Sequence, residues 1–147
     1  MAKKKPFLVA MSGGSGSGKS TLAEALLEHL PDGQAVLFGE DAYYYPMSHY
    51  GEPANKEEWT ALVGGINYDA PRSKEADRLV KDLRALKAGE TIQQPIYDYE
   101  RHDRSKETRE INSAPILILE GIHALSFPKI RSLIDLSVYV DTPDDLR

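Results

Sequence analysis

The sequence predicts an α/β fold, in which helices cover both faces of a mostly parallel sheet. Two observations lead to this prediction. Short apolar runs of strand length alternate along the chain with stretches of helical spacing. The first apolar run also passes through a glycine-rich stretch directly into a helical pattern. With 147 residues, the chain is long enough for one domain with a core of its own.

Four apolar runs are predicted strands, and they span residues 7–11, 35–39, 115–120 and 136–141. Pro115 suits the first position of its strand, where a missing N–H breaks no ladder bond. A first helix is predicted from a leucine face that Pro31 and Gly33 end, formed by Leu22, Leu26, Leu27 and Leu30. A second is expected to begin at Asn55, with Glu58 three residues later. A longer one is closed by Gly89 and built on Ala76, Leu79, Val80, Leu83 and Leu86.

Two further segments lack a clear period. Residues 43–68 and 91–114 are polar and aromatic, and we expect loops or small elements there, over the sheet edge where such folds contact substrates. Near the end, Thr142 and Pro143 are typical of an N-cap and a first helical position. A helix start with almost no helix after it predicts that residues 1–147 form a single domain cut short before its last elements.

The composition narrows the function. The formal charge of −5 disfavours a general nucleic-acid or membrane-surface binder, which usually carries a basic face. No cysteine is present, so disulfides and thiolate metal sites are excluded. No apolar run reaches the length of a signal-peptide core or a membrane span, and we expect a cytoplasmic protein. The oligomeric state is not decided by the sequence, which is compatible with a homo-oligomer.

The glycine-rich stretch fits the phosphate-loop (P-loop) pattern G-x-x-x-x-G-K-[ST] in full, from Gly13 to Ser20. Glycines let bare backbone N–H groups approach phosphate oxygens, and the following helix adds its N-terminal dipole. Lys19 would reach the β- and γ-phosphates of ATP, and the Ser20 hydroxyl would ligate Mg²⁺. The predicted nucleotide-binding residues are Gly13, Gly14, Ser15, Gly16, Ser17, Gly18, Lys19, Ser20 and Thr21.

Two other interpretations of this stretch fit less well. A flexible linker would not stand between a strand and an amphipathic helix. The dinucleotide pattern G-x-G-x-x-G, started at Gly14, would need glycine or alanine where Lys19 stands. The sequence therefore predicts a three-layer, P-loop NTPase-type fold.

Two acids stand where predicted strands end. Glu120 ends the strand at 115–120, and a carboxylate there can hold Mg²⁺ directly or through water. Asp41 follows the strand at 35–39 and is placed to take the proton from an attacking hydroxyl. From position alone Asp41 could equally be a turn acid, and Glu40 is its rival. Glu120 could be no more than a solvated acid at a strand end.

Five segments together resemble the uridine kinase family, within the wider uridine kinase and phosphoribulokinase group. They are SGGSGSGKSTLA (12–23), DAYYY (41–45), NYDAP (67–71), PIYDYERHDR (95–104) and ILEGIHAL (118–125). The resemblance implies ATP-dependent phosphorylation of the 5′-hydroxyl of uridine or cytidine. It implies that Asp41 is the catalytic base and Glu120 the metal-associated acid. It also implies substrate contacts from Tyr44, Tyr68, Asp69, Tyr97, Tyr99, His102 and Arg104.

The chain departs from the family pattern in one of these segments. The family usually has DHPDAFD where this chain has DAPRSKE, so Ala70, Arg72, Ser73 and Lys74 replace His, Asp, Ala and Phe. Another sugar, nucleoside or vitamin alcohol therefore stays open as the acceptor. The family also continues into an arginine-rich helix and lid. We expect a chain without them to bind nucleotide but to turn over poorly, because those arginines stabilise the transferring phosphoryl group.

Two other function classes compete with a small-molecule kinase. A guanine-nucleotide switch would show D-x-x-G and N-K-x-D, but the first motif is absent and residues 55–58 read NKEE. A remnant that binds nucleotide without transferring phosphate is the other. Phosphate transfer that depends on an added acceptor separates the kinase from both.

Overall fold

The computed structural model describes residues 4–146 and confirms the predicted α/β fold. Its main sheet has four parallel strands in the order β2-β5-β1-β6. They are β1 (Phe7–Gly13), β2 (Ala35–Gly39), β5 (Ile116–Glu120) and β6 (Leu136–Val140). Each agrees with a predicted strand to within two residues. Residues Leu8–Met11 of the interior strand β1 are apolar and buried because β5 and β6 flank the strand and helices cover both its faces.

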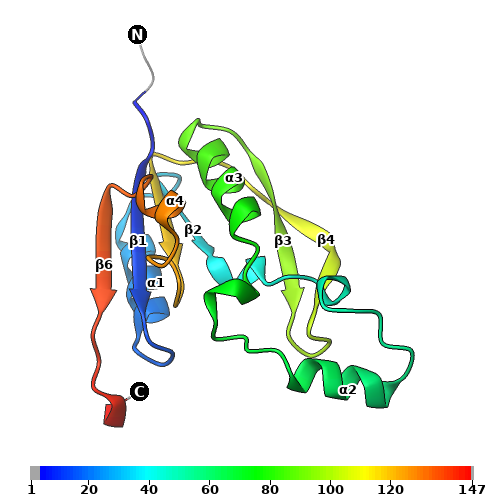
Figure 1. Cartoon of the computed structure of the whole chain (residues 1–147). Helices are drawn as coiled ribbons and strands as arrows, with labels where there is room; N and C mark the ends of the chain where they lie inside the picture. The colour runs from blue at the N-terminus through cyan, green and yellow to red at the C-terminus, as the bar shows by residue number, and fades with distance from the viewer. Residues whose placement is uncertain (1–3, 147) are drawn as a thin grey trace.

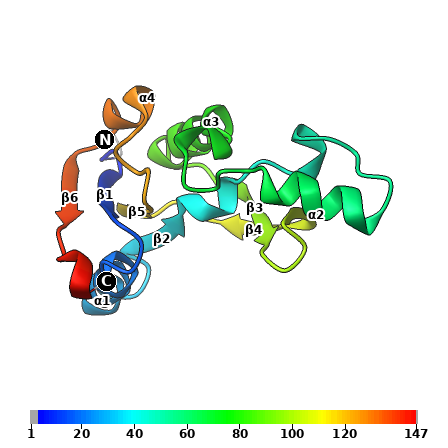
Figure 2. The same ribbon diagram turned by 60° about the horizontal axis from the view of Figure 1, so that its bottom comes forward.

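Helices lie on both sides of this sheet, which makes the fold three-layered (Figures 1 and 2). Helix α1 (Lys19–His29) covers one face, and α3 (Ala76–Lys87) and α4 (Pro128–Arg131) lie over the other. Alternate residues of β1 divide between the two cores, because successive side chains of a strand point to opposite faces. Leu8 and Ala10 pack in the core on the side of α3, whereas Val9 and Met11 pack with Ala23 of α1.

One detail of the predicted leucine face of α1 is wrong. Leu22 is 43% exposed, and the fully buried position of the helix is Ala23. Leu26 and Leu27 pack beside Ala23 against the sheet. The small Ala23 side chain lies at the centre of the contact, and the helical rotation of about 100° per residue turns its neighbour Leu22 toward solvent.

A separate antiparallel hairpin lies beside the main sheet (Figure 1). It consists of β3 (Ile92–Asp98) and β4 (Asp103–Ile111), so the expectation of loops or small elements over 91–114 is wrong for most of that segment. The sequence hides β4 because only its last residue, Ile111, is fully buried, which leaves no apolar alternation to detect. Helix α2 (Lys56–Gly64) lies at the same end of the molecule, away from the main sheet.

The predicted helix boundaries are explained by local hydrogen bonds. The Asn55 side chain accepts a hydrogen bond of 2.9 Å from the Glu58 N–H, and Glu58 Oε2 accepts one of 2.8 Å from the Ala54 N–H. After α3, Gly89 has a φ of 84°, as expected of a glycine that ends a helix. Within the described residues, Thr142 is followed by a 3₁₀ turn, Asp144–Leu146. The Thr142 hydroxyl donates a 2.6 Å hydrogen bond to the carbonyl oxygen of Ser17.

Three further 3₁₀ turns connect the elements: η1 (Glu40–Tyr43), η2 (Met47–His49) and η3 (Pro71–Ser73). The first follows β2 directly and therefore begins at the edge of the sheet where the parallel strands end. Within residues 4–146, no helix is both long and apolar enough to cross a membrane.

Candidate phosphate and acceptor site

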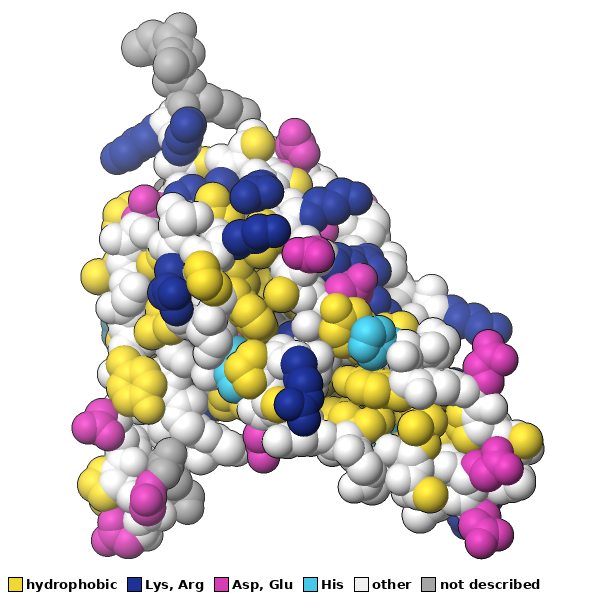
Figure 3. All heavy atoms as spheres, in the orientation of Figure 1, with side chains coloured by type: hydrophobic (Ala, Val, Ile, Leu, Met, Phe, Trp, Pro, Cys, Tyr) yellow, Lys and Arg dark blue, Asp and Glu magenta, His cyan; other side chains and the backbone are white. Residues whose placement is uncertain are grey.

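The predicted site residues gather at the carboxyl ends of the parallel strands. The register pairs Glu120, the last residue of β5, with Gly39, the last residue of β2, and with Met11 of β1, which continues to Gly13. On the other side of β1, Gly13 pairs with Val140 of β6. The glycine-rich loop, η1 and the segment after β5 all leave the sheet at this edge. In space-filling view the molecule is notched there, between a lobe that ends near the C-terminus and a lobe that carries α2 (Figure 3).

The glycine-rich loop has the backbone that a phosphate cradle needs. Gly16 and Gly18 have φ values of 75° and 92°, in the left-handed region that favours glycine. A Cβ on Gly13 would lie only 2.6 Å from Ser17 Oγ and 2.7 Å from the Val140 carbonyl oxygen. Gly18 is the N-cap residue of α1 and has no side chain that could accept hydrogen bonds from the N–H groups of the first turn. Loop and helix terminus together fit an anion.

A hollow of about 320 Å³ adjoins this loop. Its lining residues are Gly13, Gly14, Ser15, Asp69, Ile122 and Tyr139. Of the other predicted loop residues, Gly16 and Thr21 are exposed, while Ser17 is buried and its Oγ has no hydrogen-bond partner among residues 4–146. The acidic side chain that the sequence associates with the acceptor sugar, Asp69, therefore lies beside the phosphate loop.

Lys19, Ser20 and Glu120 meet at the start of α1. The Ser20 hydroxyl donates a hydrogen bond of 2.8 Å to Glu120 Oε1, and Lys19 Nζ lies 4.0 Å from the same oxygen. Lys19 Nζ also lies 3.4 Å from the Gly14 carbonyl oxygen, so its ammonium group is turned back over the loop. One hydroxyl and one carboxylate are oxygen ligands of the kind that Mg²⁺ takes beside substrate phosphates. These residues therefore fit a magnesium ion.

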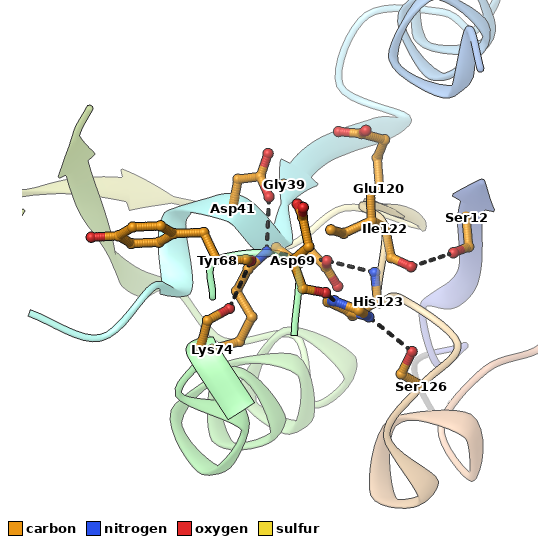
Figure 4. Close-up of polar contacts among 12 residues, drawn as sticks. Ser12, Gly39, Asp41, Tyr68, Asp69, Lys74, Glu120, Ile122, His123 and Ser126 are labelled. Atoms are coloured by element: carbon orange, nitrogen blue, oxygen red, sulfur yellow. Dashed lines mark hydrogen bonds and ion pairs between the residues drawn. The ribbon is translucent and has the colours of Figure 1, made fainter. Parts of the chain in front are cut away.

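Asp41 and its neighbour Glu40 have different environments, and Figure 4 shows the contact between Asp41 and Lys74. The Asp41 side chain is 54% exposed, and its Oδ1 accepts a hydrogen bond of 2.8 Å from Lys74 Nζ. Glu40 is fully buried, and its Oε1 accepts hydrogen bonds from the His123 N–H at 2.6 Å and from Lys74 at 3.2 Å. Burial raises the pKa of the Glu40 carboxyl above its ordinary value. Only Asp41 is therefore accessible to an acceptor hydroxyl.

The predicted acceptor residues form an aromatic cluster between η1 and the hairpin. The ring centroid of Tyr44 lies 5.6 Å from that of Tyr68 and 5.0 Å from that of Tyr97, and Tyr97 lies 5.3 Å from Tyr99. His102, at the hairpin turn, lies 5.6 Å from Tyr68. Burial and the charge of Asp41 raise the pKa of the Tyr99 hydroxyl to about 12, so it stays protonated. The structure thus brings these rings together beside Asp41.

The side chains of Asp69 and Arg104 differ in whether other residues already bind them. Asp69 is exposed, and its backbone carbonyl oxygen lies 2.6 Å from His123 Nε2. Arg104 donates through Nη1 to Glu75 Oε2 and through Nη2 to the Tyr44 carbonyl oxygen, both at 2.8 Å. The Arg104 guanidinium therefore joins the hairpin to the segments around Tyr44 and Glu75, whereas the Asp69 carboxylate is open to a ligand.

Sequence reasoning missed two residues that organise this site. Lys74 lies in the segment that departs from the family pattern. It is buried, but its charged sequence neighbours gave no sign of this, because a lysine among charged residues is ordinarily exposed. His123 connects Glu40 through its backbone N–H and Asp69 through its ring. Its place after the strand that ends at Glu120 was the one available signal.

Almost the whole chain matches the sequence model of one known protein family. The sequence model of the "Phosphoribulokinase / Uridine kinase family" matches residues 8–147. This chain belongs to that family. The phosphate loop, Asp41 and Glu120 all lie within the matched residues.

Curated members of the phosphoribulokinase/uridine kinase family resemble the chain over almost its whole length. A uridine kinase from Ligilactobacillus salivarius is 39% identical over 145 residues, which cover 99% of this chain and 64% of that protein. One from Clostridium novyi is 38% identical over 143 residues, covering 97% of this chain and 65% of that protein. The chain thus spans just under two thirds of the length of these relatives.

Solved structures share the fold at lower identity. A Bacillus stearothermophilus protein described as a possible uridine kinase has a TM-score of 0.71 at 23% identity, covering 99% of this chain and 76% of that one. Phosphoribulokinase from Rhodobacter spheroides has a TM-score of 0.62 at 18% identity, covering 93% and 51%. Both carry the P-loop fold described above.

Proposed function

We propose that this chain carries the catalytic centre of an ATP-dependent kinase that phosphorylates the 5′-hydroxyl of uridine or cytidine. One observation carries the proposal: a phosphate loop with Lys19, Ser20 and Glu120 in contact lies next to an exposed aspartate, Asp41. A Cβ on Gly39, two residues before Asp41, would lie 3.8 Å from Glu120 Oε2. The segment that carries Asp41 therefore leaves the sheet beside Glu120. The similarity to curated uridine kinases supports the same acceptor class.

In the proposed reaction, Lys19 and the loop N–H groups hold the β- and γ-phosphates of ATP. Ser20 and Glu120 would hold Mg²⁺, which neutralises charge on those phosphates when it is bound. Asp41 accepts the proton of the 5′-hydroxyl as that oxygen bonds to the γ-phosphorus. The bond from the γ-phosphorus to its bridging oxygen breaks, and ADP leaves with that electron pair. Positioning and electrostatics supply most of the acceleration.

Acceptor binding would use the open side of the aromatic cluster. Asp69 would accept hydrogen bonds from the two ribose hydroxyls, and the tyrosine rings with His102 would surround the pyrimidine. The hydroxyls of Tyr68 and Tyr97 are buried and have no hydrogen-bond partner within residues 4–146.

The test is ADP formation by this chain with ATP and Mg²⁺, against a panel of nucleosides, sugars and vitamin alcohols. We expect ADP formation that depends on uridine or cytidine, and a 5′-monophosphate product identified by mass spectrometry. A different preferred alcohol would correct the acceptor but keep the kinase. ADP formation independent of any acceptor would indicate an ATPase or switch, and ATP binding without turnover a binding module.

A further inference from the structure

A fully buried lysine lies beneath the proposed catalytic aspartate. Lys74 follows η3, and its side chain has no exposed surface. Its Nζ lies 2.8 Å from Asp41 Oδ1, 3.2 Å from Glu40 Oε1 and 4.1 Å from the centre of the Tyr44 ring (Figure 4). A buried ammonium is costly unless charges or hydrogen bonds compensate it. Here two carboxylates and a ring face hold it in one place.

The backbone around Lys74 is equally constrained. Lys74 forms an antiparallel β-bridge with Tyr44, and the Glu75 N–H donates a hydrogen bond of 2.8 Å to the Tyr43 carbonyl. Ser73, on the other side, accepts one of 3.1 Å from the Tyr45 N–H. These bonds attach the backbone of Lys74 to the chain segment that follows Asp41, so the lysine side chain starts from a fixed place beside that segment.

Asp41, in contrast, has little else to hold it. Its side chain is 54% exposed, and within residues 4–146 the bond from Lys74 is the one hydrogen bond to its carboxylate. That bond engages Oδ1, so Oδ2 stays available for an acceptor hydroxyl. With both carboxylates ionised, Glu40, Lys74 and Asp41 together carry one net negative charge. Glu40 thus offsets much of the ammonium charge, so that Asp41 can still attract a proton.

We propose that Lys74 is a positioning residue, which fixes the Asp41 carboxylate so that one oxygen faces the acceptor hydroxyl. This inference rests on the proposed function in treating Asp41 as the base. In this arrangement the charged contact between Lys74 and Asp41 orients the base, and Glu40 holds the lysine from the other side.

Two variants and two measurements test the proposal. Lys74→Met removes the ammonium but keeps the volume of the stem. We expect kcat to fall about 10²-fold, the loss typical of a misplaced reacting group, while the KM for ATP stays unchanged because the phosphate loop does not contact Lys74. A crystal structure of Lys74→Met should show the Asp41 carboxylate displaced or in several positions. An unmoved carboxylate would overturn the proposal.

The paired variant Glu40→Gln with Lys74→Met separates positioning from stability. It leaves no buried carboxylate without an ammonium, and the glutamine oxygen can still accept from the His123 N–H. We therefore expect it to regain the thermal stability that Lys74→Met loses, but not its kcat. Recovery of kcat together with Tm would show a structural role only. If the unmodified chain transfers no phosphate, the proposed function fails, and the two crystallographic positions of Asp41 still decide the role of Lys74.

Discussion

Gly121 leaves the space that the Glu40 side chain occupies. A Cβ built on Gly121 would overlap the side-chain carbons of Glu40 and lie 2.7 Å from its Oε1. Glu40 cannot easily retreat, because it is buried and bonded to both Lys74 and the His123 N–H. Gly121, which follows β5, must therefore be a glycine because the buried side chain of Glu40, which follows β2, fills the space where a Cβ would lie.

This contact predicts the effect of Gly121→Ala. The added methyl group must displace Glu40, and overpacking of this kind costs about 1–3 kcal/mol. We expect a lower free energy of unfolding, measured by urea denaturation. Gly64→Ala is the matched control, since a Cβ there would meet no atom within 4 Å. Equal stability of the two alanine variants would contradict the packing described.

Lys19→Ala should weaken ATP binding sharply. The ammonium group lies over the loop, 3.4 Å from the Gly14 carbonyl and 4.0 Å from Glu120, where a phosphate would meet it. Calorimetric titration with ATP and Mg²⁺ measures the change, and we expect an increase in Kd of at least about tenfold, as for loss of a charge-assisted hydrogen bond. Lys129→Ala, at a 69% exposed lysine on α4, is the control and should bind ATP normally. Unchanged affinity in Lys19→Ala would remove the loop from nucleotide binding.

Asp41→Asn should abolish phosphate transfer but leave ATP binding intact. Asparagine keeps the shape of the side chain and cannot accept the proton of an attacking hydroxyl. We expect kcat to fall by about 10²- to 10⁴-fold, the usual contribution of a general base, while the Kd for ATP is retained. Asp32→Asn, at an exposed position after α1, serves as the control. Near-normal turnover in Asp41→Asn would exclude this residue as the base.

Asp135 makes stability depend on pH in the acid range. Its Oδ2 accepts hydrogen bonds from the Leu8 N–H at 2.8 Å and from Lys87 Nζ at 2.9 Å. These bonds hold the pKa of the Asp135 carboxyl below its ordinary value, the backbone bond contributing most. A pKa lowered by folding stabilises the protein above the unfolded value of about 3.9, and this contribution is lost as the pH falls through the folded value.

The measurement is the thermal midpoint of the native chain and of Asp135→Asn between pH 7 and pH 2. Asparagine can still accept the Leu8 bond, so the variant isolates the charge. We expect the native chain to melt higher near neutral pH, and the gap to close below about pH 4. A gap that persists at pH 2 would show that the carboxylate charge is not its cause.

The main sheet could be predicted because local pattern and tertiary environment agree there. Strands buried on both faces are apolar throughout, and Asn55 and Gly89 mark helix ends by their own hydrogen bonding and backbone conformation. The backbone of the glycine-rich loop could be predicted for a related reason: Gly16 and Gly18 adopt left-handed conformations that glycine favours, within one continuous stretch of chain.

The hairpin and the buried lysine could not be predicted, because their causes lie elsewhere in the chain. Strand β4 is exposed along most of its length and is defined by its pairing with β3. Lys74 is buried by contacts with Glu40 and Tyr44, about thirty positions away. A lysine in a charged segment is ordinarily a solvent-facing residue. Long-range charge pairing of this kind leaves no periodic trace in a single sequence.

The two sheets of this molecule carry different parts of the proposed site. The parallel sheet carries the phosphate loop, whereas Tyr97, Tyr99 and His102 stand on a hairpin that forms no strand pairing with it. Changes confined to the hairpin would therefore alter the proposed acceptor contacts that it carries and leave the glycine-rich loop in place. Directed evolution of the preferred acceptor should therefore start with residues of the β3–β4 hairpin.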